Sequence, residues 1–174
     1  MARLYEGLVQ DIDSLLERGK EGFAHTETVD IRHAEDMMML KSSSGGRIPL
    51  DKGEQAIAQH WLEAMPAVSL SITRGETDEK AVPSLIISKR RAQDFGLAAD
   101  GRTTFHVPGG MALHAVVACG EEQYEDPDVI FRPILAFARE HRFTQKGTMW
   151  GSMLFVDCSG GMRKHYFDTY MCFE

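Results

Sequence analysis

The order of the predicted elements limits the fold of this chain more than any other feature, because strand, helix, strand and strand occur twice. Alternating apolar residues predict strands, and apolar residues spaced by three and four predict helices. We expect one copy over about residues 28–90 and a second over about residues 103–174. Each copy would cover a small antiparallel sheet with one helix, which is an α+β architecture with the helices on one face. A cleft at the junction of the two copies would suit a ligand.

The apolar pattern also places the individual elements. In the first copy the predicted elements are a strand at 28–41, a helix at 51–65 capped by Asp51, strands at 68–73 and 82–89, and a linker at 90–100. In the second copy they are strands at 103–107 and 111–119, a helix at 129–142, and strands at 148–156 and 165–173. Short glycine-containing segments separate them, including Pro108-Gly109-Gly110 and Ser159-Gly160-Gly161.

Residues 1–22 predict a helix in front of the two copies. Its apolar side chains form one stripe: Leu4, Leu8, Ile12, Leu15 and Leu16. In one interpretation the stripe packs on its own domain, and in the other it forms the contact of a homodimer. The expected organisation is therefore an N-terminal helix followed by one domain over residues 28–174.

The charge balance argues against direct binding of nucleic acid. The 174 residues include 19 basic and 26 acidic ones, which gives a net charge of -7. Nucleic-acid-binding proteins usually carry a basic patch, and the nearest candidate is the short cluster Lys89-Arg90-Arg91. Apolar runs are far shorter than the ~20 residues that cross a bilayer, so we expect no membrane partner.

The cysteines indicate a reducing environment. Cys119, Cys158 and Cys172 are odd in number and widely spaced, without a CxxC pair. This pattern predicts neither a disulfide framework nor a zinc site. The first 20 residues lack the apolar centre of a signal peptide. We therefore expect a cytoplasmic protein without a metal ion or cofactor.

The last predicted strand holds the main candidate ligand-binding residues. Alternation places Tyr166, Asp168 and Tyr170 on one face. A carboxylate between two phenols attracts a planar, cationic ligand through charge and cation–π contact. The same pattern also fits a partly hydrated sheet face with ordinary cross-strand pairs. Trp150 on the neighbouring strand fits the wall of a ligand site or a packed core, and Gly151 beside it opens space or marks a bulge.

The first copy contributes two further candidates. Trp61 and Met38 are large or adaptable apolar residues, and the ten methionines of the chain indicate an interior that adjusts to varied ligands. The candidate ligand-binding residues are therefore Trp150, Tyr166, Asp168, Tyr170, Trp61 and Met38. Common catalytic motifs such as GxSxG and HExxH do not occur, and we name no catalytic residue. The strand histidines His106, His114 and His165 lack metal-ligand spacing and are interpreted as structural or surface residues.

Residues 105–116 (FHVPGGMALHAV), followed by Gly120, resemble the gyrase-inhibitor-like effector-binding domain. This family provides the small-molecule sensor of multidrug-responsive bacterial transcription regulators and also occurs as a stand-alone protein. The resemblance covers about residues 28–174 and follows the order of elements. It implies a pocket for apolar or aromatic ligands, often with a Glu on the penultimate strand that meets cationic ones. In this chain the corresponding positions on the penultimate strand are Trp150, Gly151 and Ser152, none of which is acidic. Asp168 on the next strand is therefore the candidate substitute for that Glu.

Three functions are compatible with these features. The first, which we favour, is a sensor-like module that binds a small hydrophobic or aromatic ligand and has no DNA-binding domain of its own. The second is a hydrolase in which a tyrosine and Asp168 activate water, with His114 or His165 as an alternative base. The third is a protein-interaction module of the gyrase-inhibitor type, whose acidic surface meets a basic or DNA-associated partner.

Overall fold

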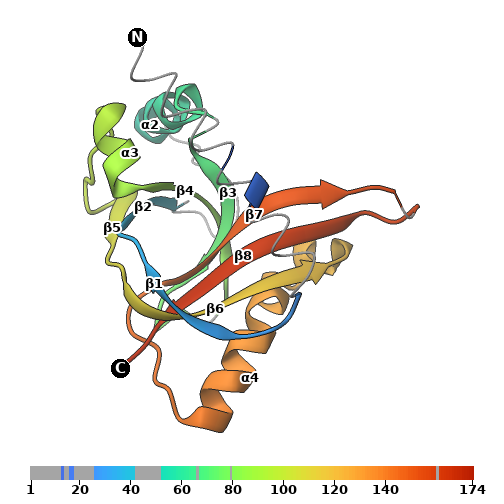
Figure 1. Cartoon of the computed structure of the whole chain (residues 1–174). Coiled ribbons are helices and arrows are strands. Elements are labelled where there is room, and N and C mark those ends of the chain that lie inside the picture. The colour runs from blue at the N-terminus through green and yellow to red at the C-terminus, as the bar shows by residue number, and fades with distance from the viewer. Residues whose placement is uncertain are drawn as a thin grey trace.

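The computed structural model describes residues 13, 16–17, 26–41, 52–65, 67–78, 80–159 and 161–174. These residues form an α+β structure with an eight-stranded antiparallel sheet and three α-helices (Figure 1). The strands are β1 (Asp30–Ala34), β2 (Met37–Lys41), β3 (Ser69–Arg74), β4 (Val82–Ser88), β5 (Thr104–Val107), β6 (Gly110–Cys119), β7 (Met149–Asp157) and β8 (Lys164–Cys172). The helices are α2 (Lys52–Glu63), α3 (Lys89–Asp94) and α4 (Arg132–His141), with 3-10 turns η1 (Glu121–Tyr124) and η2 (Pro127–Phe131).

The sheet curls until its two ends meet. The strand order is β1-β6-β8-β7-β3-β4-β2-β5. Only two residues separate β1 from β2, and only two separate β5 from β6. These two connections lie side by side, and we call them the corner of the sheet. The ladders β1·β6 and β2·β5 continue through the corner in one register. The paired residues are Asp30 with His114, Ala34 with Gly110, Met37 with Val107 and Leu40 with Thr104. The strands therefore surround an inner face, as Figure 1 shows.

One carboxylate and one glycine make the corner. Asp36 Oδ1 accepts a hydrogen bond from Gly109 N at 2.9 Å, and its Oδ2 lies 3.2 Å from both Lys89 Nζ and His106 Nε2. The Gly109 N–H and then Lys89 lower the pKa of Asp36 to about 2. A Cβ at position 109 would collide with the carbonyl oxygen of Ala34. Glycine is required here because no side chain fits between the two strands.

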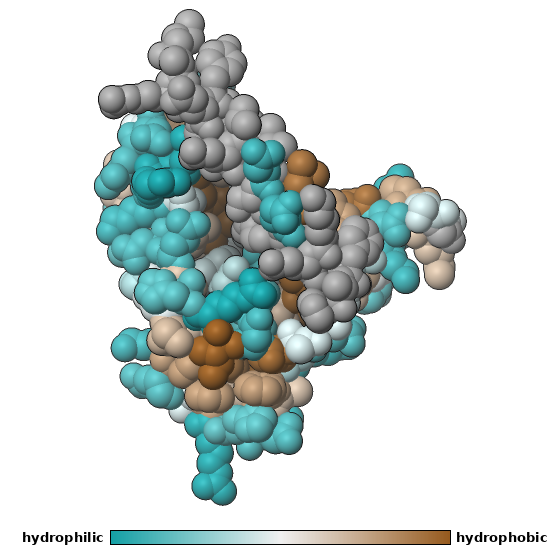
Figure 2. Space-filling view, in the orientation of Figure 1, coloured by the Kyte–Doolittle hydropathy of each residue, from teal (hydrophilic) through white to brown (hydrophobic). Residues whose placement is uncertain are grey.

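Two apolar cores lie on the outer face of the sheet and one lies inside. The core between α4, η2 and strands β6–β8 includes Leu113, Ile130, Phe131, Ile134, Met149, Phe167 and Met171. The core between α2, α3 and strands β2 and β4 includes Met38, Leu40, Trp61, Leu85 and Ile87. The inner core includes Met39, Ile86, Val107, Ala112, Trp150 and Cys172. The apolar run in β2 is continuous because alternate side chains enter different cores. Figure 2 shows a largely hydrophilic exterior with apolar surface below its middle.

The positions of most predicted elements are confirmed to within a few residues, and three details were wrong. The strand predicted at 28–41 is two strands, because the corner interrupts it. The linker predicted at 90–100 begins with α3, which is only six residues long and shows little periodicity. Ser88 Oγ caps this helix by accepting from Arg91 N at 3.3 Å. The helix predicted at 129–142 starts as the 3-10 turn η2.

Other predictions fall largely outside the described residues. Of the predicted helix at 1–22, the structure describes Asp13, Leu16 and Glu17, which are helical and exposed. Leu16 is 58% exposed. The proposed cap Asp51 and the turn residue Gly160 lie outside the description.

Candidate functional site

The inner face of β8 and its neighbours carries the candidate site. Directly opposite residues of an antiparallel ladder project to the same side, so the register traces rows of side chains across this face. One row consists of Asp30, His114, Tyr170, Trp150 and Thr73. The adjacent row consists of Val116, Asp168, Ser152, Ser71 and Ser84. Six strands thus contribute carboxylates, hydroxyls, an imidazole and two aromatic rings to these two rows.

His114 lies between two carboxylates. Its Nε2 is 2.6 Å from Asp168 Oδ1, and its Nδ1 is 2.9 Å from Asp30 Oδ1. His114 is 4% exposed and Asp168 is 1% exposed. Asp30 is more accessible and also contacts Arg32 Nε at 2.9 Å. The cluster therefore runs from an exposed ion pair on β1 to a fully buried carboxyl on β8.

The two contacts of His114 need two protons. A neutral imidazole carries one N–H, and a carboxylate only accepts hydrogen bonds. The second proton therefore resides on the other ring nitrogen or on one of the two carboxyl groups. Either arrangement makes the cluster a place where a proton can be held and passed between Asp30 and Asp168.

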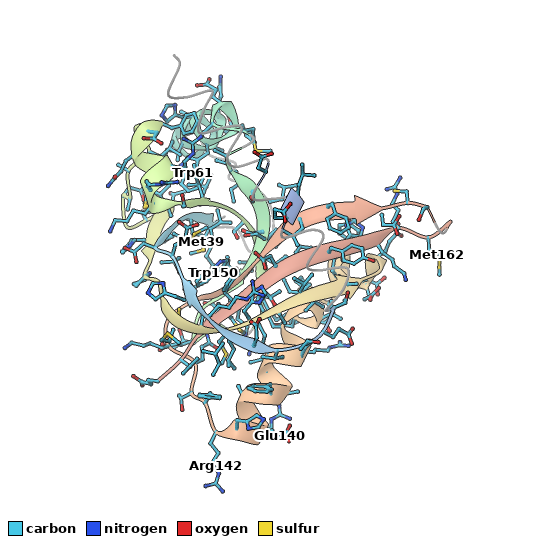
Figure 3. The ribbon with its side chains drawn as sticks, viewed as in Figure 1. Met39, Trp61, Glu140, Arg142, Trp150 and Met162 are labelled. Carbon is cyan, nitrogen blue, oxygen red and sulfur yellow. The ribbon has the colours of Figure 1, made fainter. Side chains whose placement is uncertain are left out.

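Tyr170 connects this cluster to an aromatic surface. Its hydroxyl donates to Asp168 Oδ2 at 3.2 Å, and its ring centroid lies 4.8 Å from that of His114. The ring also stacks on Trp150, with centroids 5.4 Å apart and an interplanar angle of 18°. Trp150 shares the inner core with Met39 (Figure 3).

Hydroxyl groups continue the polar surface onto β3 and β4. Ser71 Oγ and Ser84 Oγ, both buried, are 2.7 Å apart. Thr73 lies opposite Trp150, and its buried Oγ1 has no hydrogen-bond partner in the part of the chain that the structure describes. A buried hydroxyl in this state is unusual and is available to a bound molecule.

The structure brings four of the predicted site residues together and separates two. Trp150, Tyr166, Asp168 and Tyr170 share the inner face of β7 and β8; Tyr166 stacks on Phe155 at a centroid distance of 4.4 Å. Trp61 and Met38 belong to the outer core under α2 instead. Figure 3 shows Trp61 beside the helices and Trp150 within the sheet. The structure therefore does not bring all six residues together at one place.

Gly151 and His165 also lie away from this face. A Cβ at position 151 would approach Ile130 Cδ1 to 2.5 Å, so the open space is filled by η2 on the outer side. The β7 irregularity lies further along, between Met153 and Phe155. His165 occupies an odd-numbered position of β8 and Asp168 an even-numbered one, so His165 faces the outer side. Of the two alternative bases, His114 is the one that contacts Asp168.

The sequence pattern does not identify Asp30 as a site residue, and it predicts only a minor role for His114, as an alternative base. The predicted strand at 28–41 includes Asp30, but its partner depends on the register with β6, which lies 84 residues further along the chain. The available signal was the even spacing that His114 shares with Ala112 and Val116 on β6. Alternation within β6 does not show that His114 and Asp168 of β8 project to the same side of the sheet, because that depends on the register of the two strands.

Comparisons with known proteins add no family to these observations: no family profile matches the chain, and no curated protein matches it. None of the described helices has the length and apolar character needed to cross a membrane. Within the described ranges, no group of three or more His, Cys, Asp or Glu residues is gathered as a metal site.

Proposed function

We propose that this chain is a small-molecule-binding module whose ligand occupies the inner face of the sheet. The observation that carries the proposal is the Trp150–Tyr170 stack beside the Asp168–His114 hydrogen bond. Aromatic faces bind flat apolar groups, and a buried acid next to them favours a ligand that carries a positive charge or an N–H or O–H donor. The ligand class is therefore planar, aromatic and cationic or donor-bearing.

The proposed module is a relative of the gyrase-inhibitor-like effector-binding domain, built from two copies of one unit with the ligand site at their junction. The order of elements supports this, because α2 separates β2 from β3 and β4, while α4 separates β6 from β7 and β8. The pairings β2·β4·β3 and β6·β8·β7 follow the same order. Asp168 lies directly opposite Ser152, which supports its role in place of the acid on the penultimate strand.

Fluorescence of Trp150 tests ligand binding. In a Trp61→Phe background Trp150 is the remaining tryptophan, so quenching reports on the inner face. We expect saturable quenching by ethidium, a planar aromatic cation, and by the uncharged dye Nile red. Binding should also raise the melting temperature by mass action. Failure of both dyes to quench or stabilise the protein would overturn the proposal.

One variant and a matched control test how much the charge of Asp168 contributes to ligand binding. Asp168→Asn should weaken ethidium binding about tenfold, because a hydrogen bond to a charged group is lost, and should leave Nile red binding nearly unchanged. Met171→Leu is the matched control, because Met171 is buried on the opposite face of β8. Equal loss in both variants would show that the effect is structural.

Hydrolysis is a second candidate function, because His114 connects Asp168 to the more exposed Asp30. Tyr170 and Asp168 would position a water molecule, and His114 would carry its proton toward Asp30. The test is turnover of bound esters and amides followed by mass spectrometry. Loss of turnover in His114→Gln with retained binding supports catalysis, whereas recovery of every compound unchanged contradicts it.

A further inference from the structure

A second polar cluster lies on the outer face, at the end of β6 and the start of β8. Both ring nitrogens of His165 and Nε2 of Gln123 are buried without a hydrogen-bond partner among the described residues. His165 and Gln123 are each 3% exposed. Buried polar atoms in this state are rare, because burial removes the water that would otherwise bond to them. These three atoms are therefore available to a bound species.

A buried thiol belongs to the same cluster. Cys119 is the direct partner of His165 in the β6·β8 ladder, so both side chains project to the outer face. Cys119 Sγ donates to Gln123 Oε1 at 2.6 Å. The exposed Tyr124 places its ring edge-on to His165, with centroids 5.5 Å apart. The turn η1 therefore lies beside a thiol and an imidazole that project from paired residues to the same face of the sheet.

The chemistry of the pair favours a soft metal ion. A buried thiol such as Cys119 is inert toward electrophiles. A metal ion can instead replace the thiol proton directly. Zn²⁺ normally takes four protein ligands or three and water, whereas this cluster supplies one sulfur and one imidazole nitrogen. Thiolate ligands select soft ions such as Cu(I).

We propose that Cys119 and His165 form a two-coordinate site for a soft monovalent metal ion, with Cu(I) as the representative. On binding, the thiol proton leaves to solvent, and the thiolate sulfur and one ring nitrogen coordinate the ion. The oxidation state of the metal does not change. The site lies on the opposite face of β8 from Asp168 and does not depend on the inner-face ligand.

A competition titration tests the site. All proteins carry Cys158→Ser, because Cys158 is an exposed free thiol that would bind the metal adventitiously. Cu(I) is added under argon against a colorimetric Cu(I) chelator. We expect one equivalent to be retained, with affinity falling about 10- to 100-fold in Cys119→Ser and in His165→Asn. Cys172→Ser is the matched control, because Cys172 is also a buried free thiol but lies in the inner core.

Three results would overturn the proposal: no retained Cu(I), equal affinity in Cys119→Ser, or loss of affinity in the Cys172→Ser control. X-ray absorption of the Cu(I)-loaded Cys158→Ser protein gives an answer that does not depend on the folding of the other variants. One sulfur and one nitrogen ligand are expected. A copper environment with sulfur alone, or with nitrogen and oxygen alone, contradicts the assignment.

Discussion

Two buried histidines on adjacent strands show how different the two faces of this sheet are. His114 on β6 and His165 on β8 are almost equally buried. Both ring nitrogens of His114 contact carboxylates, whereas both ring nitrogens of His165 lack a partner among the described residues. The inner face receives acids from β1 and β8, and the outer face is covered by apolar helices. Burial alone therefore does not determine what a histidine does; the face on which it lies does.

Among the variants that test this comparison, Asp168→Ala should cause the largest loss in the free energy of unfolding. The substitution removes the carboxylate that contacts the buried His114 Nε2 and accepts from the partly buried Tyr170 hydroxyl. A buried group left without its hydrogen-bond partner costs about 1–3 kcal/mol; because two such contacts are lost, we expect a loss of about 4 kcal/mol in urea unfolding followed by circular dichroism. Met171→Leu conserves volume on the opposite face and should cost less than about 1.5 kcal/mol. Similar losses in the two variants would mean that the inner cluster contributes nothing specific.

A pair of glycine substitutions compares the corner with the outer face. A Cβ on Gly109 would meet backbone atoms of Ala34 and Glu35, which cannot move without opening the corner. A Cβ on Gly151 would meet the flexible end of Ile130. We expect Gly109→Ala to destabilise the protein by about 3 kcal/mol and Gly151→Ala by about 1 kcal/mol. The midpoints of thermal unfolding measure both, and a larger loss at Gly151 would contradict the role of the corner.

The element positions and part of the site could be predicted because they depend on local patterns. Apolar spacing alone places α4 and the strands of the sheet. Alternation places Tyr166, Asp168 and Tyr170 on one face, and the structure confirms this placement. These features need no knowledge of which strands are neighbours.

The remaining features depend on contacts between distant segments. The closure of the sheet requires β1 to pair with β6 and β2 with β5, and a change of register by one residue would reverse the faces. The contact of His114 with Asp30 follows from that register. Trp61 and Met38 could be predicted to be buried, but only the curled sheet shows that their core is separate from the core of Trp150.

His165→Leu tests the outer histidine in metal-free protein. The substitution removes two buried ring nitrogens that lack partners among the described residues, and it places an apolar side chain of similar size beside Cys119, which belongs to the outer core. We expect a gain of about 1 kcal/mol in the free energy of unfolding, measured by urea denaturation with a chelator present. His114→Leu should have the opposite sign, because it removes the buried imidazole that contacts both Asp30 and Asp168. Destabilisation by His165→Leu would show that the imidazole has a partner in the native protein.

The smallest expected effect concerns two exposed carboxylates that stabilise turns. Hydrogen bonds from Gly109 N–H to Asp36, and from Thr104 N–H to Asp100, lower the pKa of each carboxyl from its ordinary value of 3.8 to about 2. A lowered pKa means that the folded state holds the proton less tightly than the unfolded state. The stabilisation is therefore complete above about pH 4 and disappears as the pH falls to about 2.

Stability curves between pH 6 and pH 2 test this sign. At pH 6, Asp36→Asn and Asp100→Asn should each be less stable than the unmodified protein, and the difference should be lost as the pH falls through about 2, where the native carboxyls take up their protons. Glu140→Gln changes the charge by the same amount on the exposed side of α4 (Figure 3) and serves as the control. A difference that is independent of pH would assign the effect of Asp36 to the shape of the corner rather than to its charge.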